Sequence, residues 1–129
     1  MKYILSILVF TVVLAQLGCN KKERAGYGGN ANLKLVAKHH GLVIDSVTFY
    51  VKFDATDAPS ESSYDITQKG ITIAPGNTSV TITGLKKGDY YIYAKGWDPS
   101  ISNDVKGGIP FKITEEKDFD IIVAVTEIH

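Results

Sequence analysis

Two adjacent histidines, His39 and His40, are the residues of this chain best suited to chemistry. Imidazole nitrogens bind zinc and copper, and Asp45 or His129 is a possible further ligand. Neighbouring side chains on a strand point to opposite faces, so both histidines reach one ion only from a loop. No third ligand follows at the spacing of a zinc motif. The pattern favours solvent-exposed histidines in a turn, with a metal site as the alternative.

Other reactive combinations in the sequence are less specific. Asp98, Asn103 and Asp104 carry oxygen ligands that suit calcium, but their spacing matches no calcium loop such as the EF-hand. Serine, histidine and aspartate occur without the Gly-x-Ser-x-Gly turn of a hydrolase. We therefore expect a polar loop from Trp97 to Gly108, no enzymatic activity and no cofactor.

Aromatic residues form the stronger candidate for a binding surface. Tyr91 and Tyr93 face outward if their neighbours face the core, Tyr50 lies on another strand, and Trp97 begins the next loop. Tyrosine and tryptophan rings are enriched in binding patches and stack on sugar rings. The alternative is that these rings only cover a neighbouring strand or the segment 54–63.

Charge and length restrict the class of protein. Lysine and arginine total 14 residues, as do aspartate and glutamate, so the chain of 129 residues is neutral overall. Nucleic-acid binding calls for a clustered basic face, and we expect no nucleic acid as partner. A chain of this length corresponds to one domain with a core of its own.

Apolar and polar residues alternate with a period of two from residue 32 to the end, which is typical of half-buried strands. Pro110 cannot donate to a strand ladder and predicts a sheet edge or a bulge. About seven short strands separated by turns predict an all-β fold, a single two-sheet antiparallel sandwich over residues 32–129. The expected inward faces are Leu33, Leu35 and Ala37; Val47, Phe49, Val51 and Phe53; Val80 and Ile82; Tyr90, Ile92 and Ala94; Ile109, Phe111 and Ile113; and Phe119, Ile121, Val123 and Val125.

The segments 33–49 and 80–90 resemble the prealbumin-like sandwiches, which include Cna-B repeats and carboxypeptidase regulatory domains. The second segment contains their Gly-Leu-x-x-Gly-x-Tyr corner, which also occurs in fibronectin type III sandwiches. In such a corner Leu85 fills the core, Gly88 permits the turn and the Tyr90 hydroxyl bonds to the corner backbone. The lysine–asparagine cross-link of some Cna-B repeats is not supported, because residues 118–129 contain no asparagine for Lys34 or Lys38.

The only cysteine, Cys19, follows a short apolar stretch from Tyr3 to Leu17. That stretch is shorter than the ~20 residues of a membrane span. It resembles a bacterial lipoprotein signal, in which the chain is cut before a cysteine whose thiol carries a diacylglyceryl group. The resemblance implies a removed signal peptide at 1–18, acyl chains such as palmitate on Cys19, and a flexible tether at 19–31. Gln16 departs from the usual leucine, and cleavage after Ala15 with ordinary secretion is the alternative.

The residues after the cysteine favour a location. Asn20 is not the aspartate that holds enterobacterial lipoproteins in the inner membrane, so the resemblance implies an outer membrane lipoprotein. The mostly basic run 21–24 favours the periplasmic face. We expect a lipid-anchored, non-catalytic cell-envelope domain that binds or scaffolds a protein or glycan. The alternative is a periplasmic lipoprotein that binds a metal or small ligand with His39 and His40.

Overall fold

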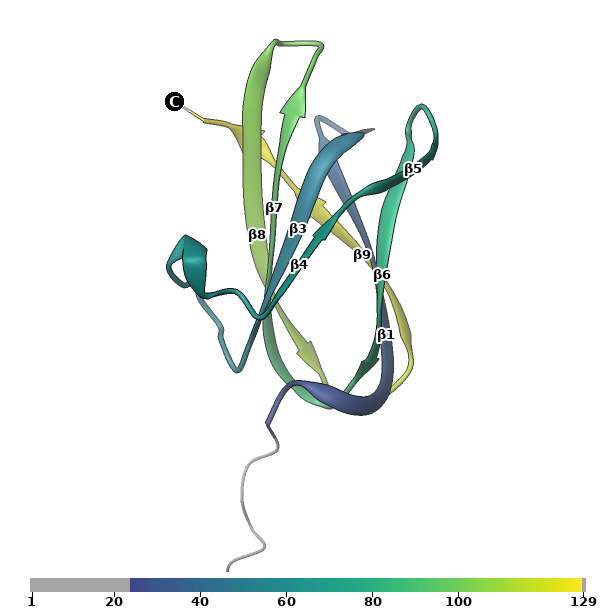
Figure 1. Cartoon of the computed structure of the whole chain (residues 1–129), viewed down its shortest axis with the longest axis vertical. Coiled ribbons are helices and arrows are strands. Elements are labelled where there is room, and N and C mark those ends of the chain that lie inside the picture. Colours follow the sequence, from purple (N-terminus) through teal and green to yellow (C-terminus); the bar gives the residue numbers. More distant parts are fainter. Residues whose placement is uncertain (1–23, 129) are drawn as a thin grey trace, which may run out of the picture.

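The computed structural model describes residues 24–128, which fold into two β-sheets packed face to face (Figure 1). The one short helix in this range is the 3₁₀ turn η1 (Glu61–Ser63). The predicted all-β, two-sheet sandwich is confirmed. None of the helices among the described residues has the length and apolar character needed to cross a membrane.

Ten strands make up the two sheets within this range. One sheet contains β1 (Tyr27–His39), β2 (Leu42–Val43), β5 (Ile71–Ala74), β6 (Asn77–Leu85) and β9 (Asp118–Ala124). The other contains β3 (Ser46–Phe53), β4 (Ile66–Lys69), β7 (Gly88–Asp98), β8 (Asn103–Ile113) and β10 (Thr126–Glu127). All pairings are antiparallel except that of β1 with β9, which is parallel.

The loop expected between Trp97 and Gly108 is mostly strand, so that prediction is wrong. Strand β7 runs on to Asp98, and β8 starts again at Asn103, directly opposite in register. Pro110 lies where β8 has β7 on one side only, because β10 pairs no further than Lys106. The expected edge position of this proline is confirmed.

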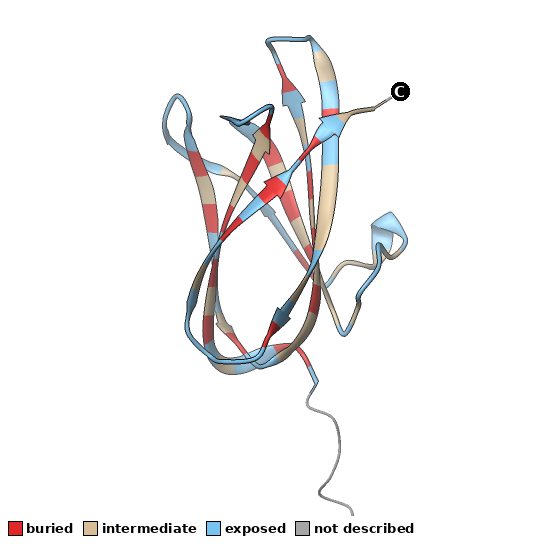
Figure 2. Ribbon diagram, turned by 180° about the vertical axis from the view of Figure 1, so that it is seen from behind, coloured by how far each residue is buried: buried red, intermediate tan, exposed pale blue. Residues whose placement is uncertain are grey.

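The core follows the predicted alternation. Buried positions alternate with more exposed ones along the central strands of both sheets, such as β1, β3, β6 and β7 (Figure 2). Leu33, Leu35 and Ala37 of β1 belong to the same core cluster as Phe49 and Val51 of β3, and all five are fully buried. Four of the predicted inward residues lie at the rim, where they are half-buried against this core: Phe53, Ile109, Phe111 and Phe119.

Strand β1 begins at Tyr27, ahead of the start predicted at residue 32. Irregular pairing with β6 between Tyr27 and Leu33 lets the glycine-rich stretch join the sheet, and Ala31 is fully buried. The end of the segment predicted as tether is therefore part of the sandwich. The expected signal peptide, Cys19 and the residues up to 23 lie outside the described range.

The corner before β7 has the structure expected from the sequence. Leu85 is fully buried, and Gly88 adopts a φ of 147°. The buried Tyr90 hydroxyl donates a hydrogen bond to the Lys86 carbonyl at 2.7 Å and accepts one from the Gly26 N–H at 2.9 Å. Tyr90 thus connects the start of the described chain to the central strand of the second sheet.

We predict that Tyr90→Phe lowers the free energy of unfolding by about 1–3 kcal/mol, because the buried Gly26 N–H loses its acceptor. Urea unfolding measures the change. Tyr91→Phe is the matched control, since this neighbouring half-buried hydroxyl makes no hydrogen bond to a described residue. Equal losses in the two variants would contradict a specific role for the Tyr90 hydroxyl.

Candidate metal centre

Three polar side chains meet at one end of the core, where inward-facing strand positions stop being apolar. His39 follows Leu35 and Ala37 as the last inward residue of β1. Asp98 holds the same position at the end of β7, and Glu127 follows the buried Val125 near the end of the chain. The alternation that builds the core therefore also directs these three groups between the sheets.

His39 is almost completely buried and hydrogen-bonded to Asp98. Its Nδ1 lies 2.6 Å from Asp98 Oδ2, and the side chain is 2% exposed. The other Asp98 oxygen accepts hydrogen bonds from the Ser100 hydroxyl at 2.6 Å and from the Ser100 N–H at 2.9 Å. The Ser100 hydroxyl, and then His39, lower the pKa of Asp98 to about 2. The ionised Asp98 is the hydrogen-bond partner of Nδ1, so Nε2 is the ring nitrogen left for a second partner.

The Nε2 atom of His39 is buried and has no hydrogen-bond partner within residues 24–128. Glu127 Oε1 lies 3.2 Å from this nitrogen without forming a hydrogen bond to it. The pKa of Glu127 is lowered, first by its own backbone N–H and then by His40, which keeps this side chain a carboxylate. When Nε2 carries no proton, two acceptors face each other, an arrangement that needs a proton or a metal ion between them.

His40 joins His39 because of the turn that follows β1. His40 and Gly41 form a two-residue hairpin loop with φ values of 51° and 78°, the signs of a type I′ turn. The two imidazole rings consequently lie on the same side, with centroids 4.0 Å apart. His40 is exposed, as expected, but the expected exposure of His39 is wrong because His39 still belongs to the inward face of β1.

Two of the three distances between the potential ligand atoms match those of a tetrahedral site. His39 Nε2 and His40 Nε2 lie 3.2 Å and 3.5 Å from the same oxygen of Glu127, and all three atoms lie within 4.8 Å of one another. Metal–ligand bonds of about 2.0–2.1 Å place tetrahedral ligands about 3.3 Å apart. A zinc or copper ion held by these three groups would keep one open position.

Glu127 reaches the histidines because the end of the chain changes sheets. After Ala124 the chain leaves β9, and the Val125 N–H donates to the Lys38 carbonyl at 2.9 Å. Strand β10 then pairs with β8, with Glu127 opposite Val105. The crossing depends on Gly107 of β8, where any side chain would overlap the Ala124 carbonyl oxygen.

The other ligands weighed from the sequence do not join this site. Asp45 accepts hydrogen bonds from Thr78 Oγ1 and the Gly76 N–H in the turn between β5 and β6, which lower its pKa. His129 lies outside the described residues. Asp98 is hydrogen-bonded to His39. Asn103 lies opposite Asp98 and forms the last residue pair of the β7–β8 hairpin. These contacts form no calcium loop.

The candidate aromatic surface is partly covered. Tyr50 and Tyr93 lie directly opposite each other, and Tyr64 stacks on Tyr93 with ring centroids 5.7 Å apart. Burial raises the pKa of Tyr64 to about 12. Tyr91 lies half-buried beside Gly108, whereas Trp97 is 43% exposed. Tyr50, Tyr91 and Tyr93 are half-buried. Their arrangement agrees better with the alternative prediction, in which these rings pack on a neighbouring strand or segment.

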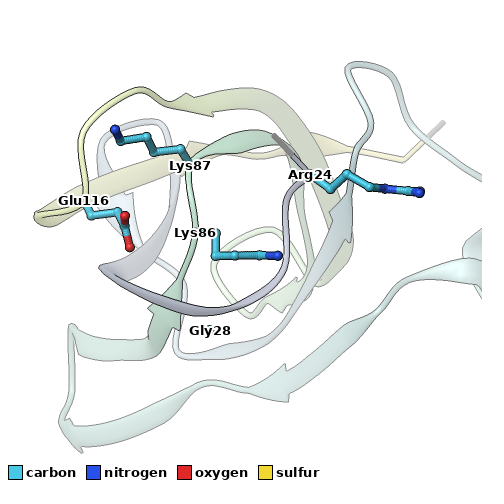
Figure 3. A pocket seen from close by; sticks show the side chains of 5 residues that line it. All are labelled: Arg24, Gly28, Lys86, Lys87 and Glu116. Atoms are coloured by element: carbon cyan, nitrogen blue, oxygen red, sulfur yellow. The ribbon is translucent and has the colours of Figure 1, made fainter. Parts of the chain in front are cut away.

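A further hollow of about 400 Å³ lies near the start of the described chain (Figure 3). Figure 3 shows Arg24 and Lys87 extending away from each other, so the charged groups do not converge on one ligand position. Glu116 accepts a hydrogen bond from the Asn30 N–H at 2.6 Å. This arrangement is less specific than the histidine site. The hollow is lined by Arg24, Gly28, Lys86, Lys87 and Glu116.

Comparisons with models of protein families, with curated proteins and with solved structures found no match to this chain. Of the candidate metal centre, the sequence indicated the two histidines but not Glu127. No short spacing links Glu127 to them. The available signal was the alternation of inward and outward residues. Continued to the end of each strand, it places His39, Asp98 and Glu127 on the inward side.

We predict a pH-dependent difference in stability between the protein and Asp98→Asn, measured by urea unfolding with a chelator present. Ionised Asp98 stabilises the fold because its pKa falls from 3.8 to about 2 on folding. The stabilisation is complete above the unfolded pKa and is lost as the pH falls through the folded one. The variant should therefore be less stable at pH 7, with the gap closing between about pH 4 and pH 2.

Asp104→Asn is the control for this measurement, because Asp104 is exposed on the outer face of β8. A gap for Asp98→Asn that stays constant from neutral to acidic pH would contradict the role given to the Asp98 carboxylate.

Proposed function

We propose that the protein is a lipid-anchored, non-catalytic cell-envelope domain that binds one divalent transition-metal ion, zinc or copper, through His39, His40 and Glu127. The observation that carries the proposal is the buried Nε2 of His39, which faces a carboxylate without a hydrogen bond. An unpaired buried polar atom costs about 1–3 kcal/mol, and a bound metal ion offsets that cost.

The ligand set favours transition metals. Two imidazole nitrogens and one carboxylate oxygen suit zinc and copper, whereas calcium and magnesium prefer oxygen ligands only. Asp98 orients the His39 ring through Nδ1, which is the common arrangement behind a metal-bound histidine. The exposed His40 leaves the site open to solvent, so an ion can enter and leave without unfolding.

The position of the site suits an anchored protein. The described chain starts at one end of the sandwich, and strand β1 runs to the opposite end, where the described chain also ends (Figure 1). His39 is the last residue of that strand. With acyl chains on Cys19, the metal site would lie at the end of the domain away from the membrane surface.

We predict submicromolar binding of one zinc or copper ion per chain in calorimetric titration. His40→Ala and Glu127→Gln should each weaken binding by about tenfold or more, since each removes one of three ligands. The double change His39→Ala with His40→Ala should abolish it. His40 is exposed, so its variant tests the site without disturbing the core.

Glu116→Gln is the matched control, because it removes the same charge at an exposed position outside the histidine site. Undiminished affinity in His40→Ala and Glu127→Gln would overturn the proposal. The absence of zinc and copper binding in the unmodified protein would overturn it as well.

We predict that the protein extracted from membranes begins at Cys19 and carries added acyl mass, as the resemblance to lipoprotein signals implies. Intact-mass spectrometry measures both properties at once. A chain that begins at Gln16 without added mass would contradict the lipid anchor and support ordinary secretion. Loss of the anchor in Cys19→Ser provides the control.

A further inference from the structure

The outer face of the second sheet carries a row of lysines that the proposed metal site does not use. Lys69 of β4 pairs with Thr48 of β3, Thr48 pairs with Lys95 of β7, and Lys95 pairs with Lys106 of β8. Directly paired residues share a face, and all three lysines are exposed. At about 4.8 Å per strand, the row is about 14 Å long.

No ion pair among the described residues balances the charge of this row, although Glu61 lies beside Lys95 and Asp104 lies two residues from Lys106 on the same face. Lys95 and Lys106 are directly opposite each other, and like charges in such pairs destabilise a sheet. Within residues 24–128, no carboxylate forms an ion pair with any lysine of the row. Lys52 on the same face differs, since it lies 3.5 Å from Asp65. The row is therefore suited to an anionic ligand.

Aromatic rings border the row on both sides. Tyr50 and Tyr93 form the next outward pair on one side, and the partly exposed Trp97 occupies the next outward position on the other. A hollow of about 140 Å³ opens beside the row, where Tyr64 covers the two tyrosines. Rings beside cations favour a ligand with flat apolar faces as well as negative charge. The hollow is lined by Tyr50, Glu61, Tyr64, Tyr93 and Lys95.

We propose that this face, the lysine row with the partly exposed Trp97 beside it, binds an acidic polysaccharide whose sugars carry carboxylates. A sugar ring would stack on Trp97 while the carboxylates lie over the lysines. Glu61 beside the hollow and Asp104 beside Trp97 suit sugar hydroxyls as hydrogen-bond acceptors. Both carboxylates disfavour nucleic acid as the ligand, because nucleic acid is densely charged: duplex DNA carries about one negative charge per 1.7 Å.

The test measures retention of the full protein on polygalacturonate, with neutral dextran and single-stranded poly(dT) as comparison polymers. We expect polygalacturonate binding that weakens as salt screens the charges, and weaker binding of the other two polymers. Lys95→Gln with Lys106→Gln should weaken binding by about tenfold or more, equivalent to about 1.4 kcal/mol. This variant removes a like-charge pair and should fold at least as well as the unmodified protein.

Lys86→Gln with Lys87→Gln is the matched control, because it removes the same charge from the exposed turn before β7. Its affinity should be unchanged, whereas Trp97→Ala should lose binding at unchanged net charge. Equal losses in the two lysine double variants would show an effect of total charge and overturn the proposal. So would no binding of polygalacturonate, or tighter binding of poly(dT). None of these results depends on the metal site.

Discussion

The arrangement of both sheets depends on the crossing of the chain at Val125. Strand β9 lies parallel to β1, and one residue later the chain pairs with β8 in the other sheet. The Val125 N–H bonds to Lys38, and Gly107 leaves the space that the crossing backbone needs. One short segment therefore closes the end of the sandwich and fixes where Glu127 lies relative to His39.

The buried residues at that closed end differ in polarity from those in the rest of the core. Apart from Thr78, the buried strand residues elsewhere among the described residues are apolar, but here a histidine lies between two carboxylates. Asp98 is fully paired with Ser100 and His39, whereas the other side of the His39 ring is left without a hydrogen bond. Sites that break the local rules of a fold in this way are where function is expected. The imbalance is confined to one nitrogen, which a proton or a metal ion shared with Glu127 would satisfy.

The sequence predicted the parts of the fold that depend on local pattern. The alternation identified the core strands, and the Gly-Leu-x-x-Gly-x-Tyr pattern located the corner at Tyr90. It did not show that β7 and β8 continue through residues 97–108, because glycine and aspartate have low strand propensity and pairing between the strands overrides it. Glu127 was missed for a similar reason: its approach to His39 depends on a parallel pairing between the two ends of the described chain.

Strand β7 links the two proposed sites through its register. Its inward positions end at Asp98 behind the metal site, while its outward positions present Tyr93, Lys95 and Trp97. A shift of one residue would exchange the two faces, burying a lysine and exposing the carboxylate that holds His39. The Tyr90 hydroxyl opposes such a shift, because its hydrogen bonds to Lys86 and Gly26 form in one register only. The corner at one end of the sandwich therefore determines the chemistry available at the other end and on the outer face.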